Sequence, residues 1–276
     1  MSVPELVATG WSLHLPGVPM AAAVLAATGR APGAWASEEH AAPERAATVL
    51  GRKGLLAKDA ATRLALCAVH RALRLTPGQR PVPVLDARTA VVACSNLGNL
   101  ETVARVARGV AAEGIRGVSV LDAPNVSSNV IASAVALWFR FGGPNLMVCS
   151  GATAGLDGLG LAALLLRARR ADRVVLVGAE PADDVAATVH PSIRAGAACV
   201  VLEPAAGRTA GPRVAVGAEG AGPSVHLGEF YGAGGVVSLA LAAHLVGDEG
   251  LAEAGVLDAG EGVRRTAVVR AAGARR

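Results

Sequence analysis

Residues 143–157 read GPNLMVCSGATAGLD, which combines a short apolar strand, a tight turn of small residues and the start of a helix. Enzymes often mount a nucleophile on such a turn, because the positive end of the helix dipole stabilises a thiolate or an oxyanion there. The tip of this turn is Gly151-Ala152-Thr153, and the methyl group of Ala152 cannot attack a substrate. The turn therefore either lost its reactive residue or never carried one.

The neighbours of Ala152 offer substitutes for a nucleophile. Cys149 and Ser150 precede the tip, and Thr153 follows it. A side chain at the end of a strand points in a different direction from the tip, and three extended residues span up to about 10 Å. We expect Cys149 to be a buried small apolar residue, with a role as a new nucleophile as the alternative. Thr153 is a candidate for capping the next helix and for binding substrate.

Other residues with acid–base side chains are scattered. Glu229 could act as an acid or a base in a pocket, and His190 and His226 are loop histidines without evident partners. HLGE at 226–229 is too short a pattern for a metal site, and no two cysteines form a CxxC pair. The glycines of GAGG at 232–235 lack the spacing of a dinucleotide-binding loop. The sequence therefore predicts neither a metal nor a cofactor.

The composition excludes several classes of partner. The net charge is +4, but the arginines are scattered and aromatic residues make up only 3% of the chain, so nucleic-acid binding is not expected. No apolar run reaches the ~20 residues that cross a bilayer, and the N-terminus lacks the pattern of a secretion signal. We expect a cytoplasmic protein with reduced thiols and no membrane association.

Strand and helix patterns alternate along the chain, which indicates an α/β fold. Asp59 is expected to cap a helix through residue 73, and Asn99 to cap another that Gly114 ends. The remaining expected strands are 5–13, 89–94, 146–149, 173–178, 197–202 and 266–271, and the remaining expected helices are 124–141, 154–169 and 232–247, with residues 20–50 irregular or frayed helix.

Several motifs in consecutive order resemble the β-ketoacyl synthases of the thiolase superfamily. GPNLMVCSGATAGLDGLGLAALLLRARRADRVVLVGAE at 143–180 is similar without a gap to that family's core, and AGAACVVLE at 195–203 is similar to a later strand. LVATGWSLHLPG at 6–17 resembles the family's first strand, and 124–143 resembles its helix before GPN. The resemblance covers residues 1–205 and becomes weaker after them.

The resemblance implies a thiolase-like fold, in which two related βαβαβ halves pack as alternating helix and sheet layers. Residues 1–205 would form the N-terminal half and residues 206–276 a shortened C-terminal half of one compact domain. The resemblance also implies a dimer, since the GPN strand of the family pairs across a two-fold axis. Such pairing would cover an edge strand that is otherwise exposed.

The resemblance further implies that the machinery for condensation is missing. The family's nucleophilic cysteine falls on Ala152, and the histidine of its G-H-T segment falls on Glu229. The family's H-G-T-G-T segment has no counterpart, and in place of its Gly-Phe-Gly-Gly loop we find only Ala271-Ala-Gly-Ala. An enzyme without its nucleophile and its base loses this route of catalysis. Condensation by this chain alone is therefore not expected.

Ser127, Ser128 and Asn129 lie at an expected helix start, where such side chains satisfy free N–H groups. In the similar family this region lines the acyl pocket, so the three residues are also candidates for binding substrate.

Three functions remain open from the sequence. The first is a chain-length-factor-like subunit that pairs with an active ketosynthase and serves an acyl carrier protein in polyketide or fatty-acid-like biosynthesis. The second is an enzyme of altered chemistry on carrier-bound or CoA thioesters, such as acyl transfer, hydrolysis or cyclisation, using Glu229, Ser150 or Cys149. The third is a homodimeric binding or scaffold protein.

Overall fold

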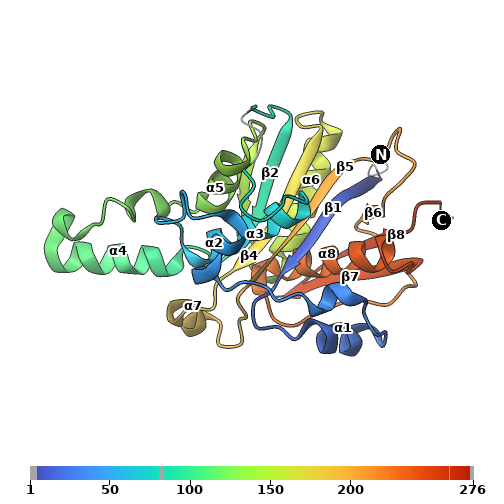
Figure 1. Ribbon diagram of the computed structural model, residues 1–276, viewed down its shortest axis with the longest axis horizontal. Helices are drawn as coiled ribbons and strands as arrows, with labels where there is room; N and C mark the ends of the chain where they lie inside the picture. The colour runs from blue at the N-terminus through green and yellow to red at the C-terminus, as the bar shows by residue number, and fades with distance from the viewer. Residues whose placement is uncertain (1–4, 81–83, 261, 274–276) are drawn as a thin grey trace.

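The computed structural model describes residues 5–80, 84–260 and 262–273, which form an eight-stranded sheet flanked by helices (Figure 1). The strands lie in the order β3-β2-β4-β5-β1-β6-β8-β7. Their bounds are Leu6–His14 (β1), Thr89–Cys94 (β2), Asn145–Val148 (β3), Arg173–Glu180 (β4), Gly196–Pro204 (β5), Arg213–Val216 (β6), Glu253–Gly260 (β7) and Val263–Arg270 (β8). The helices are Met20–Thr28 (α1), Ala47–Leu50 (α2), Ala60–Ala72 (α3), Leu100–Glu113 (α4), Val130–Phe139 (α5), Ala154–Arg167 (α6), Asp184–Val189 (α7) and Gly234–Gly247 (α8).

The central part of the sheet is mixed. Strands β3, β2 and β4 run parallel, whereas β5 is antiparallel to both β4 and β1. Parallel neighbours need a crossover, and α6 supplies the one between β3 and β4. Every residue of β2 is buried, because helices cover both faces of the sheet there. This explains why the strands read as continuous apolar runs.

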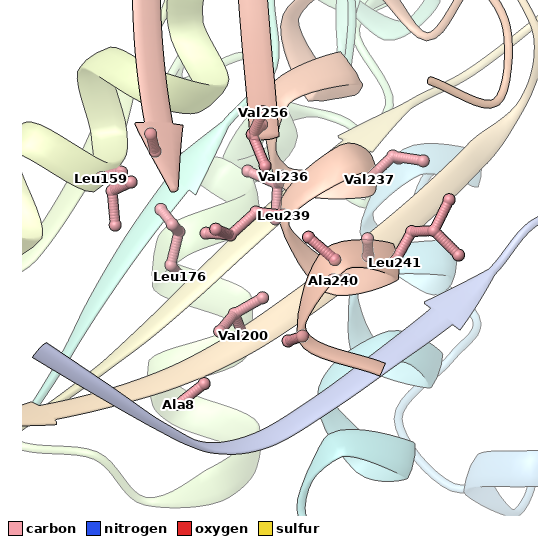
Figure 2. Packing of buried hydrophobic residues seen from close by; sticks show 14 of the residues in the cluster. Ala8, Leu159, Leu176, Val200, Val236, Val237, Leu239, Ala240, Leu241 and Val256 are labelled. Carbon is pink, nitrogen blue, oxygen red and sulfur yellow. The ribbon is translucent and has the colours of Figure 1, made fainter. Parts of the chain in front are cut away.

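Two pairs of helices cover these two faces. Helices α3 and α5 pack on one face against Val91 and Val175, and α6 and α8 pack on the other against Val92 and Leu176. Figure 2 shows Leu176 and other core side chains of the sheet beside α8. The alternation of side chains along each strand thus builds two separate hydrophobic cores.

The C-terminal strands form a further layer over α8. Strand β6 pairs with β1 only at Leu6 and Val7, after which the two strands diverge. Strands β8 and β7 continue from β6 as an antiparallel hairpin, and Val256 of β7 joins the core cluster of Val236 and Leu239 on α8 (Figure 2). Helix α8 therefore lies between two layers of strands, which is the alternation of helix and sheet layers expected from the sequence.

Most expected elements are present. Asp59 caps α3 as predicted, since its Oδ1 accepts a hydrogen bond of 2.7 Å from the backbone N–H of Thr62. Helix α4 ends at Gly114, and Asn99 occupies the N-cap position as predicted, but its side chain makes no capping hydrogen bond. The Asn99 amide instead donates to the carbonyl oxygens of Asn125 and Ser127, which fixes the loop before α5.

Three expectations differ from the structure. The helix expected at 124–141 begins only at Val130, because residues 123–125 form a separate short 3-10 turn. Strand β7 and helix α7 were not predicted. Residues 20–50 contain a regular helix, α1, in addition to short turns.

In the described parts of the chain, no helix combines the length and the apolar character that crossing a membrane requires.

Helices α6 and α8 approach one another at glycines. A methyl group built on Gly155 would lie 2.7 Å from both the Gly235 Cα and the Val236 nitrogen, which is closer than a side-chain carbon can approach. A methyl group built on Gly160, one and a half turns further along α6, would meet nothing within 4 Å. The glycine at 155 is therefore required by backbone contact, whereas the glycine at 160 is not.

Substitution of these two glycines tests the crossing. We expect Gly155→Ala to lower the free energy of unfolding by about 2 kcal/mol, because the added methyl group forces the two backbones apart. Gly160→Ala is the matched control on the same helix and should raise the free energy by about 0.5 to 1 kcal/mol through helix propensity. Chemical denaturation measures both values, and equal effects of the two substitutions would contradict the close crossing.

Candidate functional site

The turn between β3 and α6 occupies the end of the sheet at which β2 and β4 also terminate. Residues Gly151–Thr153 form a single 3-10 turn, and Gly151 has a φ of +69°, a conformation that favours glycine. Ala152 at the tip is half-buried. The small residues of the sequence thus produce the strand–turn–helix geometry that was predicted.

Asn96, after β2, holds this turn in place. Its Nδ2 donates to the Gly151 oxygen (2.9 Å), and its Oδ1 accepts from the Gly151 nitrogen (3.0 Å). Asn96 is held in turn by Glu180 at the end of β4, whose Oε1 accepts from the Asn96 nitrogen (2.7 Å). Neither Asn96 nor Glu180 was among the site residues predicted from the sequence, although an acid that ends an apolar strand is a usable signal.

Glu180 is a fully buried carboxyl with several donors around it. Its Oε2 accepts hydrogen bonds from the Ser95 hydroxyl (2.9 Å) and from the Leu97 nitrogen (3.0 Å). Burial raises the pKa of Glu180 to about 7, and the hydrogen bonds from Asn96 and Leu97 oppose that rise. Because its side chain has no exposure to solvent, Glu180 acts as a fixed support for the turn.

Ala152 faces the tip of the β7–β8 hairpin. A methyl group built on Gly260 would lie 2.7 Å from the Ala152 Cβ, so glycine is required for the close approach of the hairpin. Gly260 ends β7 beside Ala152, and Gly262 precedes β8 with a φ of +77°.

Asp258 of β7 lies at the start of both α6 and α8. Its Oδ2 accepts from the Leu156 nitrogen (3.1 Å), and a methyl group on Gly235 would overlap its carboxyl group. Burial raises the pKa of Asp258 to about 7, and the nearby charges of Asp157 and Glu229 add to the rise. Asp258 was not predicted from the sequence, because its partners are distant in the chain.

Donors at the start of α6 are partly occupied by the protein itself. The Gly151 nitrogen donates to Asn96, the Ala154 nitrogen to the Gly151 oxygen, and the Leu156 nitrogen to Asp258. A free helix start would be a ready site for an anion, but here a side-chain carboxyl already occupies part of it. The turn is therefore less open to a thioester carbonyl than its sequence indicated.

Ser150 and Thr153 are both bonded to Asp157 in the first turn of α6. The Ser150 hydroxyl donates to Asp157 Oδ2 (2.7 Å), as does the Thr153 hydroxyl (2.8 Å), and Arg265 Nε donates to Oδ1 (2.7 Å). Partial burial acts to raise the pKa of Asp157, but these hydrogen bonds keep it below its usual range. The two hydroxyls therefore stabilise the turn, and Thr153 is buried there.

Cys149 follows β3, the edge strand, and is exposed in the single chain. Burial of its side chain, as expected from the sequence, would require a second chain paired with β3. Partial burial and the charge of Glu180 raise the pKa of the Cys149 thiol, so the unreactive protonated form dominates at neutral pH. Cys67, Cys94 and Cys199 are buried as expected.

Glu229 accepts a hydrogen bond within its own turn. Its Oε1 accepts from the Tyr231 nitrogen (2.8 Å), and its backbone oxygen accepts from the Arg194 nitrogen (2.9 Å). The Tyr231 hydroxyl approaches Gly151, and the Tyr231 ring packs on His190 with ring centres 4.7 Å apart. Glu229 and His190 thus both contact Tyr231, which in turn lies near the turn at Gly151.

His226 and the predicted substrate residues lie elsewhere. His226 is exposed on the loop before α8, and Ser127 and Ser128 are exposed before α5. Asn129 does not cap α5 through its side chain, which was expected. Its Nδ2 instead donates to Asn145 Oδ1 of β3 (2.7 Å), so it connects α5 to the edge strand.

This arrangement of a vacant turn tip between the two helix starts can be compared with known proteins. The family model for the β-ketoacyl synthase N-terminal domain matches residues 24–205. The chain belongs to the β-ketoacyl synthase family. No curated protein is detectably similar to the chain along its sequence.

Solved structures agree with this family. A structure described as the ishigamide ketosynthase/chain length factor superposes with a TM-score of 0.74 at 22% identity, covering 98% of this chain and 100% of that one. A type II polyketide acyl-carrier protein in complex with its ketosynthase, bound to the hexaketide, has a TM-score of 0.68 at 14% identity, covering 98% and 99%.

A β-ketoacyl synthase from Burkholderia phymatum also has a TM-score of 0.68, at 12% identity, covering 97% of this chain and 99% of that one. At these identities the likenesses establish the fold. The thiolase-like α/β fold predicted from the sequence is confirmed.

The buried Asp258 predicts a specific pH dependence. Between its usual pKa of 3.8 and about 7, the unfolded chain carries this carboxyl ionised while the folded chain keeps it protonated. The folded state thus binds the additional proton, and stability from this group falls as pH rises, by up to about 1.4 kcal/mol per pH unit. Asp258→Asn removes the ionisation and keeps an oxygen for the Leu156 nitrogen.

We therefore expect the unfolding free energy of Asp258→Asn, minus that of the parent, to increase from pH 4 to about pH 7 and then to level off. Urea denaturation at a series of pH values measures this difference. A difference that stays constant over the whole range would show that Asp258 is not held protonated.

Proposed function

We propose that this member of the β-ketoacyl synthase family is a non-condensing subunit, analogous to a chain length factor, which pairs with an active ketosynthase. The observation that carries the proposal is the vacant tip of the turn before α6, where the methyl group of Ala152 meets Gly260. A ketosynthase needs a thiolate at such a turn to take up the acyl chain. In this chain the space beside the tip is filled by the hairpin backbone.

The edge strand β3 supports a paired state. In the described residues β3 pairs with β2 alone, so its other edge presents free backbone groups, and Leu146 on it is 36% exposed. Native proteins rarely leave such an edge uncovered. We propose that β3 pairs with the corresponding strand of a ketosynthase across a two-fold axis.

The arm formed by α4 and the following turns supports the same partner. Helix α4 extends away from the sheet (Figure 1), and Ile115 and Val120 beyond it are 85% and 86% exposed. Val110 and Leu121 of the same segment are also exposed, at 47% and 51%, and it is a group of exposed apolar side chains, rather than a single one, that is typical of protein–protein contact surfaces. A partner subunit that covers β3 and this arm would bury them.

The acyl carrier protein and the pathway belong to the same proposal. Two of the similar structures are described as a ketosynthase/chain length factor and as an acyl-carrier protein with its ketosynthase, which supports a role beside a carrier in polyketide or fatty-acid-like biosynthesis. The unpaired cysteines support a reducing, cytosolic location.

The alternative of altered chemistry has weaker support. Ser150 donates to Asp157, Glu229 accepts from the Tyr231 nitrogen, and the raised pKa of the Cys149 thiol keeps it protonated. Asp157 is a weak base for Ser150, because its hydrogen bonds with Thr153 and Arg265 keep its pKa below the usual range. The third alternative, a homodimeric scaffold, differs from the proposal in the chain that pairs with β3: a second copy of this protein instead of a ketosynthase.

Co-expression with an intact ketosynthase tests the proposal. We expect the two chains to elute together in size-exclusion chromatography and the pair to condense malonyl units when a carrier protein is supplied. A chain that stays monomeric and leaves the ketosynthase unaffected, or that pairs only with itself, would contradict it.

Leu146→Arg tests the surface used for pairing. A charge placed on β3 should weaken the complex with the ketosynthase by at least about tenfold, because the guanidinium would be buried without a partner. Leu25→Arg is the matched control, since Leu25 on α1 is also an exposed leucine, at 50%. Pull-down titration measures both, and equal weakening by the two substitutions would exclude β3 as the contact.

A further inference from the structure

The sheet opens beside β1 on the side away from β5. Strand β6 leaves β1 after Val7, so the outer edge of β1 from Gly10 to His14 has no strand neighbour in the described residues. A cavity of about 430 Å³ lies at this opening, between the C-terminal ends of α3 and α8. Helix α8 is 14 residues long, so the cavity lies about 20 Å from the vacant turn at its other end.

One wall of the cavity carries two immobilised indole rings. Trp11 Nε1 donates to Asp248 Oδ2 (3.0 Å), and Trp35 Nε1 donates to Glu249 Oε1 (2.5 Å). The Trp35 ring also packs on the His244 imidazole, with ring centres 4.1 Å apart. Because their polar atoms are already bonded, the indoles offer flat apolar surface to a bound molecule.

The last turn of α3 forms an opposite wall with an excess of hydrogen-bond donors. Arg71 Nη1 pairs with Glu38 (2.5 Å), but Arg71 Nε has no partner in the described structure. Arg74 lines the cavity and makes no ion pair or side-chain hydrogen bond with any described residue. His40 Nδ1 accepts from the Leu15 nitrogen (3.1 Å), so in the neutral ring Nε2 carries the proton and is a donor.

These walls are complementary to one class of small molecule. On this wall two guanidinium groups and an imidazole N–H face one carboxylate, Glu38. The second carboxylate that lines the cavity, Asp248, already accepts from Trp11 Nε1 and lies 2.8 Å from His244 Nδ1. The guanidinium group of Arg74 therefore has no carboxylate partner and can bind a further anion. A rigid apolar body fits the indole wall, and the volume is within the range of cavities that bind small organic molecules. A bound carboxylate would supply the acceptor that Arg74 lacks.

We propose that this cavity is a binding site for a small aromatic carboxylic acid. The carboxylate lies against Arg74 and Arg71, and the ring lies on Trp11 and Trp35. The site is separate from the position of Ala152, so it does not depend on the role proposed for that turn.

Isothermal titration of the purified full chain with benzoate tests the site, with benzylammonium as the probe of opposite charge and similar shape. We expect benzoate to bind at millimolar concentration or below and benzylammonium not to bind. Arg74→Gln should weaken benzoate binding about tenfold, the effect of one charge-assisted hydrogen bond.

Arg140→Gln is the matched control. Arg140 is exposed and follows a helix in the left-handed conformation (φ 61°), as Arg74 does (φ 55°), but it does not line this cavity. Benzoate should bind this variant as it binds the parent, and both variants should keep the parental melting temperature. The proposal is overturned if benzoate does not bind, if benzylammonium binds equally well, or if the two variants weaken benzoate binding to the same extent.

Discussion

The architecture around the candidate site depends on the close approach of α6 and α8 at Gly155 and Gly235. Backbone contact at this crossing leaves no room for a side chain and places the starts of both helices next to one another. The turn Gly151–Thr153 lies where the starts of α6 and α8 meet, and it contacts β7. The crossing is therefore the constraint that sets where the turn with Ala152 lies relative to both helices.

Groups of the protein itself occupy the space around this turn. Asp258 supplies a carboxyl group to the start of α6, and Gly260 brings the hairpin against the methyl group of Ala152. Asn96 holds the turn through a hydrogen bond to Gly151, and Glu180 in turn holds Asn96. The turn is therefore well supported by hydrogen bonds, and its tip is the methyl group of Ala152. These features support the proposed role of a non-condensing subunit.

Sequence reasoning succeeded where the signal is local. The apolar run of β2, the Asp59 cap and the strand–turn–helix at Ala152 each depend on neighbouring residues, and each is present. It failed where partners are distant. Asn129 and Asn99 have the side chains of helix caps but bond to segments that lie elsewhere in the fold. Asp258 was missed because the residue types of β7, EAGVLDAG, do not alternate between polar and apolar, although the strand alternates between buried and partly exposed residues in the structure. Its contact with Leu156 also spans about a hundred residues.

We propose that this chain does not hold an acyl group covalently. Intact-mass spectrometry tests it directly, after the purified chain is incubated alone with a labelled acyl-carrier thioester and malonyl carrier protein. We predict that the mass of the chain is unchanged and that no extended product forms. An intact ketosynthase treated in the same way is the control and should gain the mass of the acyl group. A stoichiometric acyl adduct on the chain, followed by extension with malonate, would contradict the account.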